Sequence, residues 1–177
     1  MRKIILGVAV SLDGFIEGPN GEYDWCFTDQ DYGMSDFMKR IDAIFFGRKS
    51  YEMMMKASVP DGGNPWGGIK SYVFSNTWKN STDDFELVTG DVESKVKEFK
   101  SVSGKDIWLF GGAVLTSSLL NAGLVDELGM AVHPILLGKG KPLFLDIKHR
   151  IGTKLVESKT YDTGLVYQTY EVLRQTH

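Results

Sequence analysis

The segment Asp106-Ile-Trp-Leu-Phe-Gly-Gly-Ala-Val-Leu115 passes from an apolar run through two glycines into a helix-forming stretch. Residues 107–110 have the apolar and aromatic side chains of a buried strand, and residues 113–120 are typical of a helix. Gly111 and Gly112 therefore occupy a strand-to-helix corner. Because glycine has no Cβ, backbone amides there can approach an anion closely, and the helix start adds unpaired N–H donors. The segment predicts either a phosphate-binding turn or a plain tight turn.

Composition limits the architecture and the partners. A chain of 177 residues with 42% hydrophobic content can bury one substantial core, so we expect a single domain over residues 1–177. The net charge of −3, without a basic block, disfavours nucleic-acid binding. The first apolar run, residues 4–10, is too short for a signal peptide or a membrane span. We therefore expect a cytoplasmic protein without a membrane partner.

Cysteine and histidine usage argues against thiol and metal chemistry. Cys26 is the lone cysteine and lies between two aromatic residues and near Asp24 and Asp29, an environment that disfavours a thiolate. We interpret it as a structural thiol. The three histidines, His133, His149 and His177, do not have zinc-ligand spacing, so no metal is expected.

Strand and helix patterns alternate along the chain. The predicted strands are residues 4–10, 43–46, 71–75, 85–88, 107–110 and 127–133, and the predicted helices lie around residues 32–40, 51–56, 92–99 and 113–120. Segments 154–161 and 165–173 flank Asp162-Thr-Gly164, a hairpin signal. The continuous apolar run at 4–10 indicates a strand at the sheet centre. The fold class is α/β, with a mixed, mostly parallel central sheet flanked by helices and a C-terminal antiparallel hairpin.

Polar and glycine-containing segments follow four predicted strands, at the edge where ligands collect in open α/β sheets. They are Ser11-Leu-Asp-Gly14, Gly47-Arg-Lys-Ser50, Ser75-Asn-Thr77 and Gly111-Gly-Ala113. Positive charge at a helix start opposes the helix dipole, and a bound phosphate would explain Arg48 and Lys49 there. Two anion sites on neighbouring strand ends would suit a dinucleotide with an extra ribose phosphate, which is NADPH. A solvated Arg-Lys pair is the alternative.

Six segments in this order resemble the dihydrofolate reductase-like superfamily. Four of them are Val8-Ala-Val-Ser-Leu-Asp-Gly14, Asp42-Ala-Ile-Phe-Phe-Gly-Arg-Lys-Ser-Tyr51, Tyr72-Val-Phe-Ser75 and Trp108-Leu-Phe-Gly-Gly112. Leu124-Val-Asp-Glu-Leu128 and His133-Pro-Ile-Leu-Leu-Gly138 are more similar to its riboflavin-pathway branch, the C-terminal reductase domain of the bifunctional deaminase/reductase. The resemblance covers nearly the whole chain. It implies an NADPH-dependent reductase that resembles the 5-amino-6-ribosylaminouracil phosphate reductase.

The resemblance also implies where the cofactor lies, with its phosphates on the diglycine turn and its 2′-phosphate near residues 48–50 and 75–77. In the family a cis peptide joins the two glycines. The implied cofactor-binding residues are Ala9, Gly47, Arg48, Lys49, Ser50, Ser75, Asn76, Thr77, Phe110, Gly111, Gly112, Ala113, Val114 and Leu115.

The chain departs from both family patterns at the substrate side. Dihydrofolate reductases grip folate with an arginine before the third strand, and the corresponding place here is near Ile69, with Lys70 adjacent. Riboflavin-pathway reductases usually carry a basic residue directly after Ser-Leu-Asp-Gly, where this chain has Phe15. A stand-alone relative with its own substrate, a small heterocycle or carbonyl compound, fits best. Dihydrofolate reduction and a non-catalytic NADPH-binding dimeric module are the alternatives.

Three aspartates are the candidate catalytic residues. Asp13 is the first choice to face the nicotinamide and substrate, and Asp29 or Asp31 is the candidate acid or proton relay. A helix or turn cap is the alternative role for each aspartate.

Aromatic residues are the candidate substrate-binding groups. Trp25, Phe27 and Tyr51 could stack on a flat substrate, with core packing as the alternative. Leu165, Tyr167 and Tyr170 in the final hairpin suggest an apolar surface and hence a homodimer, although packing within one chain would explain them too.

Overall fold

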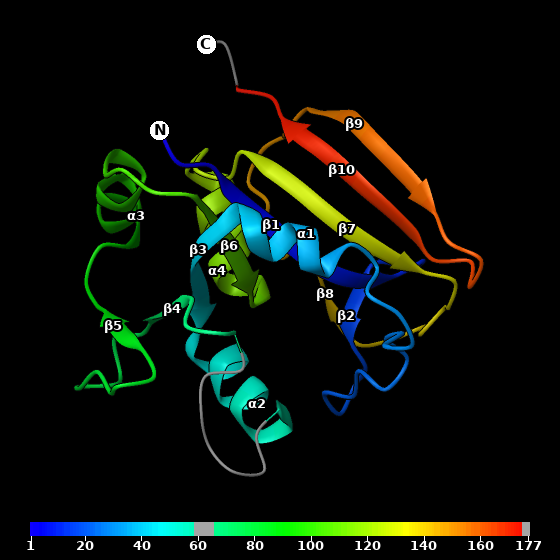
Figure 1. The fold of residues 1–177 in the computed structure, drawn as a ribbon, viewed down its shortest axis with the longest axis horizontal. Helices are drawn as coiled ribbons and strands as arrows, with labels where there is room; N and C mark the ends of the chain where they lie inside the picture. Colours follow the sequence, from blue (N-terminus) through cyan, green and yellow to red (C-terminus); the bar gives the residue numbers. More distant parts are fainter. Residues whose placement is uncertain (59–65, 175–177) are drawn as a thin grey trace.

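An eight-stranded sheet forms the centre of the molecule (Figure 1). The computed structural model describes residues 1–58 and 66–174. In spatial order the strands are β5 (Glu86–Val88), β4 (Lys70–Phe74), β3 (Ile41–Gly47), β6 (Asp106–Gly111), β1 (Ile4–Ser11), β7 (Glu127–His133), β10 (Val166–Val172) and β9 (Thr153–Thr160). The six strands from β5 to β7 are parallel, and β10 and β9 are antiparallel. The predicted fold class is confirmed, as is the interior position of β1.

Helices cover both faces of the sheet because alternate strand residues point to opposite sides. Phe45 and Leu109 pack in a core with α3 (Val92–Ser101) and α4 (Ala113–Asn121). Phe46 and Trp108, their neighbours in sequence, pack in a second core with α1 (Met34–Arg40) and α2 (Arg48–Ser58). The carboxyl ends of β3 and β6 point toward α2 in Figure 1. Burial on both faces explains why these strands read as continuous apolar runs.

The segment between β1 and β3 differs from its prediction. Helix α1 begins at Met34, after Tyr32 adopts a positive φ of 50°, and β3 begins directly after it at Ile41. Ile41 is thus a strand residue, two positions before the predicted start of this strand. The segment between β1 and α1, for which no strand was predicted, contains β2 (Phe15–Glu17), which pairs with β8 (Lys141–Pro142) in a separate two-stranded sheet. Strands this short show no hydrophobic period, so only their tertiary pairing reveals them.

The C-terminal hairpin forms as predicted, but its exposed residues differ. Gly164 turns the chain with a φ of 85° and donates its amide to the carbonyl of Tyr161 at 2.9 Å. Leu165 is 1% exposed, so its assignment to an apolar surface is wrong: it fills the core behind the turn. Leu155 and Val156 on the edge strand β9 are instead 50% and 63% exposed. The homodimer stays a prediction, and these two residues are its better candidates.

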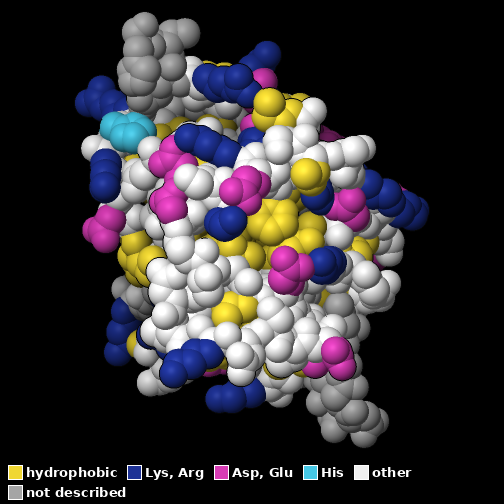
Figure 2. All heavy atoms as spheres, turned by 90° about the vertical axis from the view of Figure 1, so that its left-hand side faces the viewer, with side chains coloured by type: hydrophobic (Ala, Val, Ile, Leu, Met, Phe, Trp, Pro, Cys, Tyr) yellow, Lys and Arg dark blue, Asp and Glu magenta, His cyan; other side chains and the backbone are white. Residues whose placement is uncertain are grey.

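The face that carries α3 and β5 mixes both signs of charge. Figure 2 shows Lys and Arg side chains interspersed with Asp and Glu around a small apolar area on this face. Lys70 of β4 pairs with Glu86 of β5, and Lys97 pairs with Glu93 within α3, each at 2.6 Å. Among the residues that the structure describes, no helix is long and apolar enough to cross a membrane.

Candidate active site

The diglycine corner brings the ends of β3 and β6 into close contact. The Gly111–Gly112 peptide is cis, as the family resemblance implied, and Gly111 has a φ of 116°. A Cβ on Gly47 would lie 3.3 Å from the amide nitrogen of Gly112. A side chain on Gly47 would press on the backbone of β6, and the positive φ of Gly111 also favours glycine. Helix α4 begins at the next residue, so its first-turn amides face this corner.

Ser50 points its hydroxyl at the same corner. Its Oγ lies 2.7 Å from the place that a Cβ on Gly112 would occupy. The residue as a whole is 9% exposed, and no described residue forms a hydrogen bond with its hydroxyl. The hydroxyl is not fully buried, since Trp25 Nε1 is the one buried polar side-chain atom without a partner among the described residues, so a ligand would replace solvent at this donor. The corner therefore combines a tight glycine backbone, a helix start and an unpartnered donor.

Two charged residues that the sequence analysis missed lie beside this corner. The ammonium nitrogen of Lys141 is 3.7 Å from the Cβ position of Gly112. Lys141 also pairs with Glu17 at 2.5 Å, across the two-stranded sheet of β2 and β8. The only sequence signal for this lysine is Gly138-Lys-Gly-Lys141, a loop in which nothing indicates a neighbour at Gly112.

The predicted 2′-phosphate residues begin helix α2. Arg48 is half-buried and its guanidinium donates to Glu52 at 3.0 Å, one helical turn away, while Lys49 is exposed. The Glu52 carboxylate offsets the unfavourable position of a cation at a helix start. Arg48 is therefore held by a partner that an incoming phosphate would have to displace or share.

The segment 75–77 forms a tight turn next to a groove. Ser75 Oγ accepts hydrogen bonds from the amides of Thr77 and Trp78, each at 3.2 Å. The side-chain oxygen of Asn76 accepts from the amide of Gly90 at 2.9 Å, which joins this turn to the start of α3. A groove of about 590 Å³ extends from there between segments 90–93, 114–122 and 145–148. Asn76 thus links one predicted phosphate segment to an open groove along α4.

The other predicted cofactor residues divide by accessibility. Val114 is 72% exposed and lines the groove, whereas Ala113 and Leu115 are buried and could offer a ligand only their backbone. Phe110 is half-buried, with its ring 4.8 Å from Phe46 by centroids. Ala9 is half-buried in β1.

Asp13 holds a loop in place. Its carboxylate accepts from the Ser11 hydroxyl at 2.6 Å and from the amides of Leu137 and Gly138 at 3.1 and 2.7 Å. These hydrogen bonds, the one from Ser11 foremost, lower the pKa of Asp13 below its usual value. An ionised carboxylate with three donors is a poor proton donor at neutral pH. The geometry supports the turn-cap alternative, and a catalytic role stays a prediction.

Asp29 and Asp31 occupy the approach to α1. Asp31 accepts from the Ser35 hydroxyl and amide and from the Gly33 amide, and the Ser35 hydroxyl is the main cause of its lowered pKa. This is the helix-cap role considered as its alternative. Asp29 accepts from the Tyr32 hydroxyl at 2.7 Å. Of the two, Asp29 has the less engaged carboxylate.

Trp25 and Phe27 pack around a buried histidine. Their rings lie 5.3 and 5.1 Å from the His133 ring, by centroids. His133 is 2% exposed; its Nε2 accepts the Phe27 amide at 3.1 Å, and its Nδ1 lies 3.0 Å from the Ala131 carbonyl, which can only accept. The tautomer is therefore the one with the proton on Nδ1. His133 therefore fixes the loop to β7.

The His133 contact predicts a pH-dependent stability. Burial lowers the pKa of His133 below 6.5, because desolvation disfavours the charged ring more than the hydrogen bond to the Ala131 carbonyl favours it. The unfolded chain then binds a proton first as the pH falls below about 6.5, so native stability should decrease from there down to the folded pKa. Urea unfolding at pH 5, 6, 7 and 8 measures this. His133→Gln is the control: equal pH slopes in both proteins would contradict the prediction.

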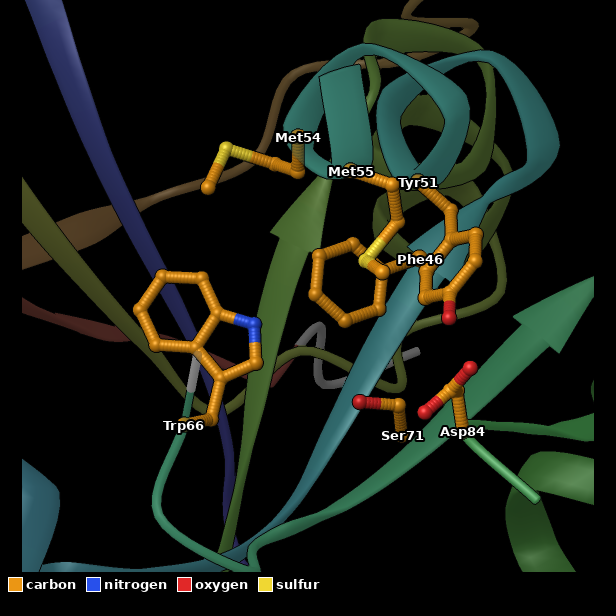
Figure 3. Close-up of a pocket in the computed structure, with 7 residues that line it drawn as sticks. All are labelled: Phe46, Tyr51, Met54, Met55, Trp66, Ser71 and Asp84. Carbon is orange, nitrogen blue, oxygen red and sulfur yellow. The ribbon is translucent and has the colours of Figure 1, made fainter. Parts of the chain in front are cut away.

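Tyr51 lies apart from the other two predicted substrate residues. It is 8% exposed under α2, where its ring packs 4.9 Å from Phe85 and 5.5 Å from Phe46. Figure 3 shows its hydroxyl above the Asp84 carboxylate in a narrow recess that Trp66 also lines. Burial, and then the charge of Asp84, raise the pKa of Tyr51. The packing supports the core alternative for Tyr51, and its stacking role stays a prediction.

Cys26 behaves as the predicted structural thiol. Burial, with a smaller effect of Asp24, raises its pKa to about 11. The described residues contain no group of three or more His, Cys, Asp or Glu side chains placed to hold a metal ion.

Comparison with known protein families places the chain. The model of the RibD C-terminal domain matches residues 2–167. The chain belongs to the RibD C-terminal domain family. This RibD C-terminal domain protein is 43% identical to the uncharacterized protein YyaP of Bacillus subtilis (strain 168), over 96% of its own length and 94% of that of YyaP.

Solved structures share the fold of this RibD C-terminal domain. A putative riboflavin biosynthesis protein from Shewanella sp. PV-4 superimposes with a TM-score of 0.86 at 26% identity, over 98% of this chain and 100% of that one. Dihydrofolate reductase from Enterococcus faecalis, solved with NADP(H), superimposes with a TM-score of 0.69 at 18% identity, over 96% of each chain. The latter similarity shows the common fold.

Proposed function

We propose that the protein is an NADPH-dependent reductase that transfers hydride to a small heterocyclic or carbonyl compound. The observation that carries the proposal is the convergence of Gly47, Ser50 and the Gly111–Gly112 corner at the start of α4. Membership of the RibD C-terminal domain family and the fold shared with an NADP(H)-bound reductase support it.

The residues at the strand ends fit a dinucleotide. A Cβ on Gly112 would clash with the Ser50 hydroxyl, and within residues 1–58 and 66–174 this hydroxyl and the first-turn amides of α4 are donors that a ligand could engage. Arg48 and Lys49 could hold a 2′-phosphate, and the groove next to Asn76 could take the adenosine end. Each part of NADPH therefore has a candidate site: the donors at the corner for the diphosphate, the cations of α2 for the 2′-phosphate, and the open groove for the adenosine.

When bound, NADPH supplies the hydride. The chain itself would orient the cofactor and the substrate and supply a route for the proton. Asp13 and Asp31 are poor donors because hydrogen bonds lower their pKa values, so we keep Asp29 as the candidate proton relay. Trp25 and Phe27, on the loop that His133 holds, are the candidate contacts for a flat substrate.

Titration of the purified protein with NADPH, followed by cofactor fluorescence, tests the first step. We expect saturable binding with a Kd below about 100 µM. No binding in that range would reject both the reductase and a non-catalytic NADPH-binding module.

A substrate panel tests the second step by NADPH oxidation at 340 nm, with aldehydes, ketones, dihydrofolate and 5-amino-6-ribosylaminouracil phosphate. We expect turnover with an unphosphorylated carbonyl or heterocycle. Lys70 pairs with Glu86 and lies over the Tyr72 ring, so it is not a free anchor for the folate tail. Dihydrofolate as the best substrate would therefore reject the proposed substrate class.

A further inference from the structure

Lys141 is a cation at the diglycine corner that comes from a different part of the fold than the other groups there. It belongs to β8, whereas Ser50 lies in the first turn of α2 and Gly112 precedes α4. Its ammonium nitrogen and the Ser50 Oγ lie 3.7 and 2.7 Å from the same point, the Cβ position of Gly112. Three elements therefore direct an ammonium, a hydroxyl and helix-start amides at one place.

These groups are all hydrogen-bond donors, which defines the chemistry of their ligand. The first-turn amides of a helix have no intrahelical acceptor, and Ser50, 9% exposed as a residue, directs its hydroxyl at the same place. An anion with several oxygens would satisfy them together, and each bond to the ammonium would be charge-assisted. The Lys141 ammonium comes from a different element and points to an anion independently of the helix start.

The ion pair with Glu17 limits how freely the Lys141 ammonium can bind an anion. The Glu17 carboxylate is 2.5 Å from the Lys141 ammonium, with side-chain exposures of 19% for Glu17 and 34% for Lys141. The chain at Gly140 passes so close to Glu17 that a Cβ there would overlap the Glu17 carbonyl. Asp13 also fixes the preceding loop through the amides of Leu137 and Gly138. The lysine is thus held near the corner on a backbone with little freedom.

We infer that Lys141 contacts and neutralises the diphosphate of the dinucleotide cofactor, and that Glu17 competes with this diphosphate for the ammonium. The inference rests on the proposed function, since it assigns a residue to the same site. Because NADH and NADPH share the diphosphate, Lys141 acts on both equally. Arg48, at the proposed 2′-phosphate position, acts on NADPH alone.

The opposite charges of Lys141 and Glu17 separate this role from a merely structural ion pair. If the ion pair were only structural, replacing either Lys141 or Glu17 would lower the stability of the protein. Both replacements would then change ligand affinity in the same direction. A lysine that contacts the ligand predicts opposite effects: Lys141→Gln weakens binding, whereas Glu17→Gln releases the ammonium and tightens it. Lys139→Gln is the matched control, because Lys139 is exposed on the same loop.

The experiment measures dissociation constants of NADPH and NADH by fluorescence, and of inorganic pyrophosphate by calorimetry, for these variants and the wild type. Thermal unfolding without ligand shows that each variant is folded. We expect Lys141→Gln to weaken all three ligands by roughly tenfold, as for the loss of one charge-assisted hydrogen bond at a partly exposed site. Glu17→Gln should tighten them by about threefold, and Lys139→Gln should leave them unchanged.

Each outcome decides between the alternatives. Equal affinities for Lys141→Gln and Lys139→Gln, or weaker binding by Glu17→Gln, would overturn the inference. If the wild type binds pyrophosphate in a Lys141-dependent way but neither dinucleotide, the proposed function fails and the anion site stands. Binding of none of the three ligands would reject both.

Discussion

Replacing Gly112 by alanine is expected to weaken cofactor binding strongly. The added Cβ would lie 2.7 Å from the Ser50 Oγ and would fill the space through which an anion reaches the α4 amides. The contact is too short for a methyl group, so the Ser50 hydroxyl or the corner itself must move, and overpacking of this kind costs about 1–3 kcal/mol of stability. NADPH affinity should fall on the order of 100-fold, measured by fluorescence titration, with a lower Tm.

Two further variants separate the steric effect from the loss of the binding surface. Gly152→Ala is the matched control, because its nearest neighbour, Leu173, is 3.4 Å away and the residue is exposed. The double variant Ser50→Ala with Gly112→Ala removes the clashing hydroxyl, so it should recover most of the Tm but not the affinity. Wild-type affinity in the Gly112→Ala single variant would show that the cofactor does not use this corner.

Replacing Arg48 by alanine is expected to remove the preference for NADPH. The guanidinium stands at the start of α2, where its charge opposes the helix dipole and is offset by Glu52 at 3.0 Å. If it binds the 2′-phosphate, its loss should weaken NADPH by about 30-fold and NADH by less than about twofold, which corresponds to two or more charge-assisted hydrogen bonds. The measurement is the ratio of the two dissociation constants.

Glu52→Gln provides the control for this variant. It frees Arg48 from its partner without removing the guanidinium, so NADPH should bind as well as or better than in the wild type. If both Arg48→Ala and Glu52→Gln lost the preference for NADPH, the Arg48–Glu52 ion pair would act by stabilising the start of α2 and not by binding the 2′-phosphate. Equal weakening of NADH and NADPH by Arg48→Ala would move the 2′-phosphate site to another part of the strand edge.

Much of the fold could be predicted because its signals are local. The apolar run of β1, the helical pattern of α3 and the Gly164 turn each depend on residues a few positions apart, and each forms as expected. The short pair of β2 and β8 could not be predicted, since two or three residues carry no period. Leu165 was misjudged because the pattern of one hairpin does not show what packs against it.

The candidate site follows the same division. Strand-end segments pointed to Gly47, Ser50 and Gly111–Gly112, because parallel strands end on one edge of a sheet. The aspartates were harder to assign. A carboxylate after a strand or before a helix can cap the helix, hold a loop in place or take part in catalysis, and only the hydrogen-bond donors around it distinguish these roles. Asp13 and Asp31 have their donors from loop and helix amides.

The sequence by itself determined the α/β class, the parallel core and the glycine corner after β6, since period, turn residues and missing side chains are properties of short segments. Only the tertiary structure decided what surrounds that corner. Lys141 and Glu17 reach it because β2 and β8 pair, and the Ser50 hydroxyl reaches it because β3 lies beside β6. Such contacts join residues far apart in the chain, and their distances depend on how whole elements pack.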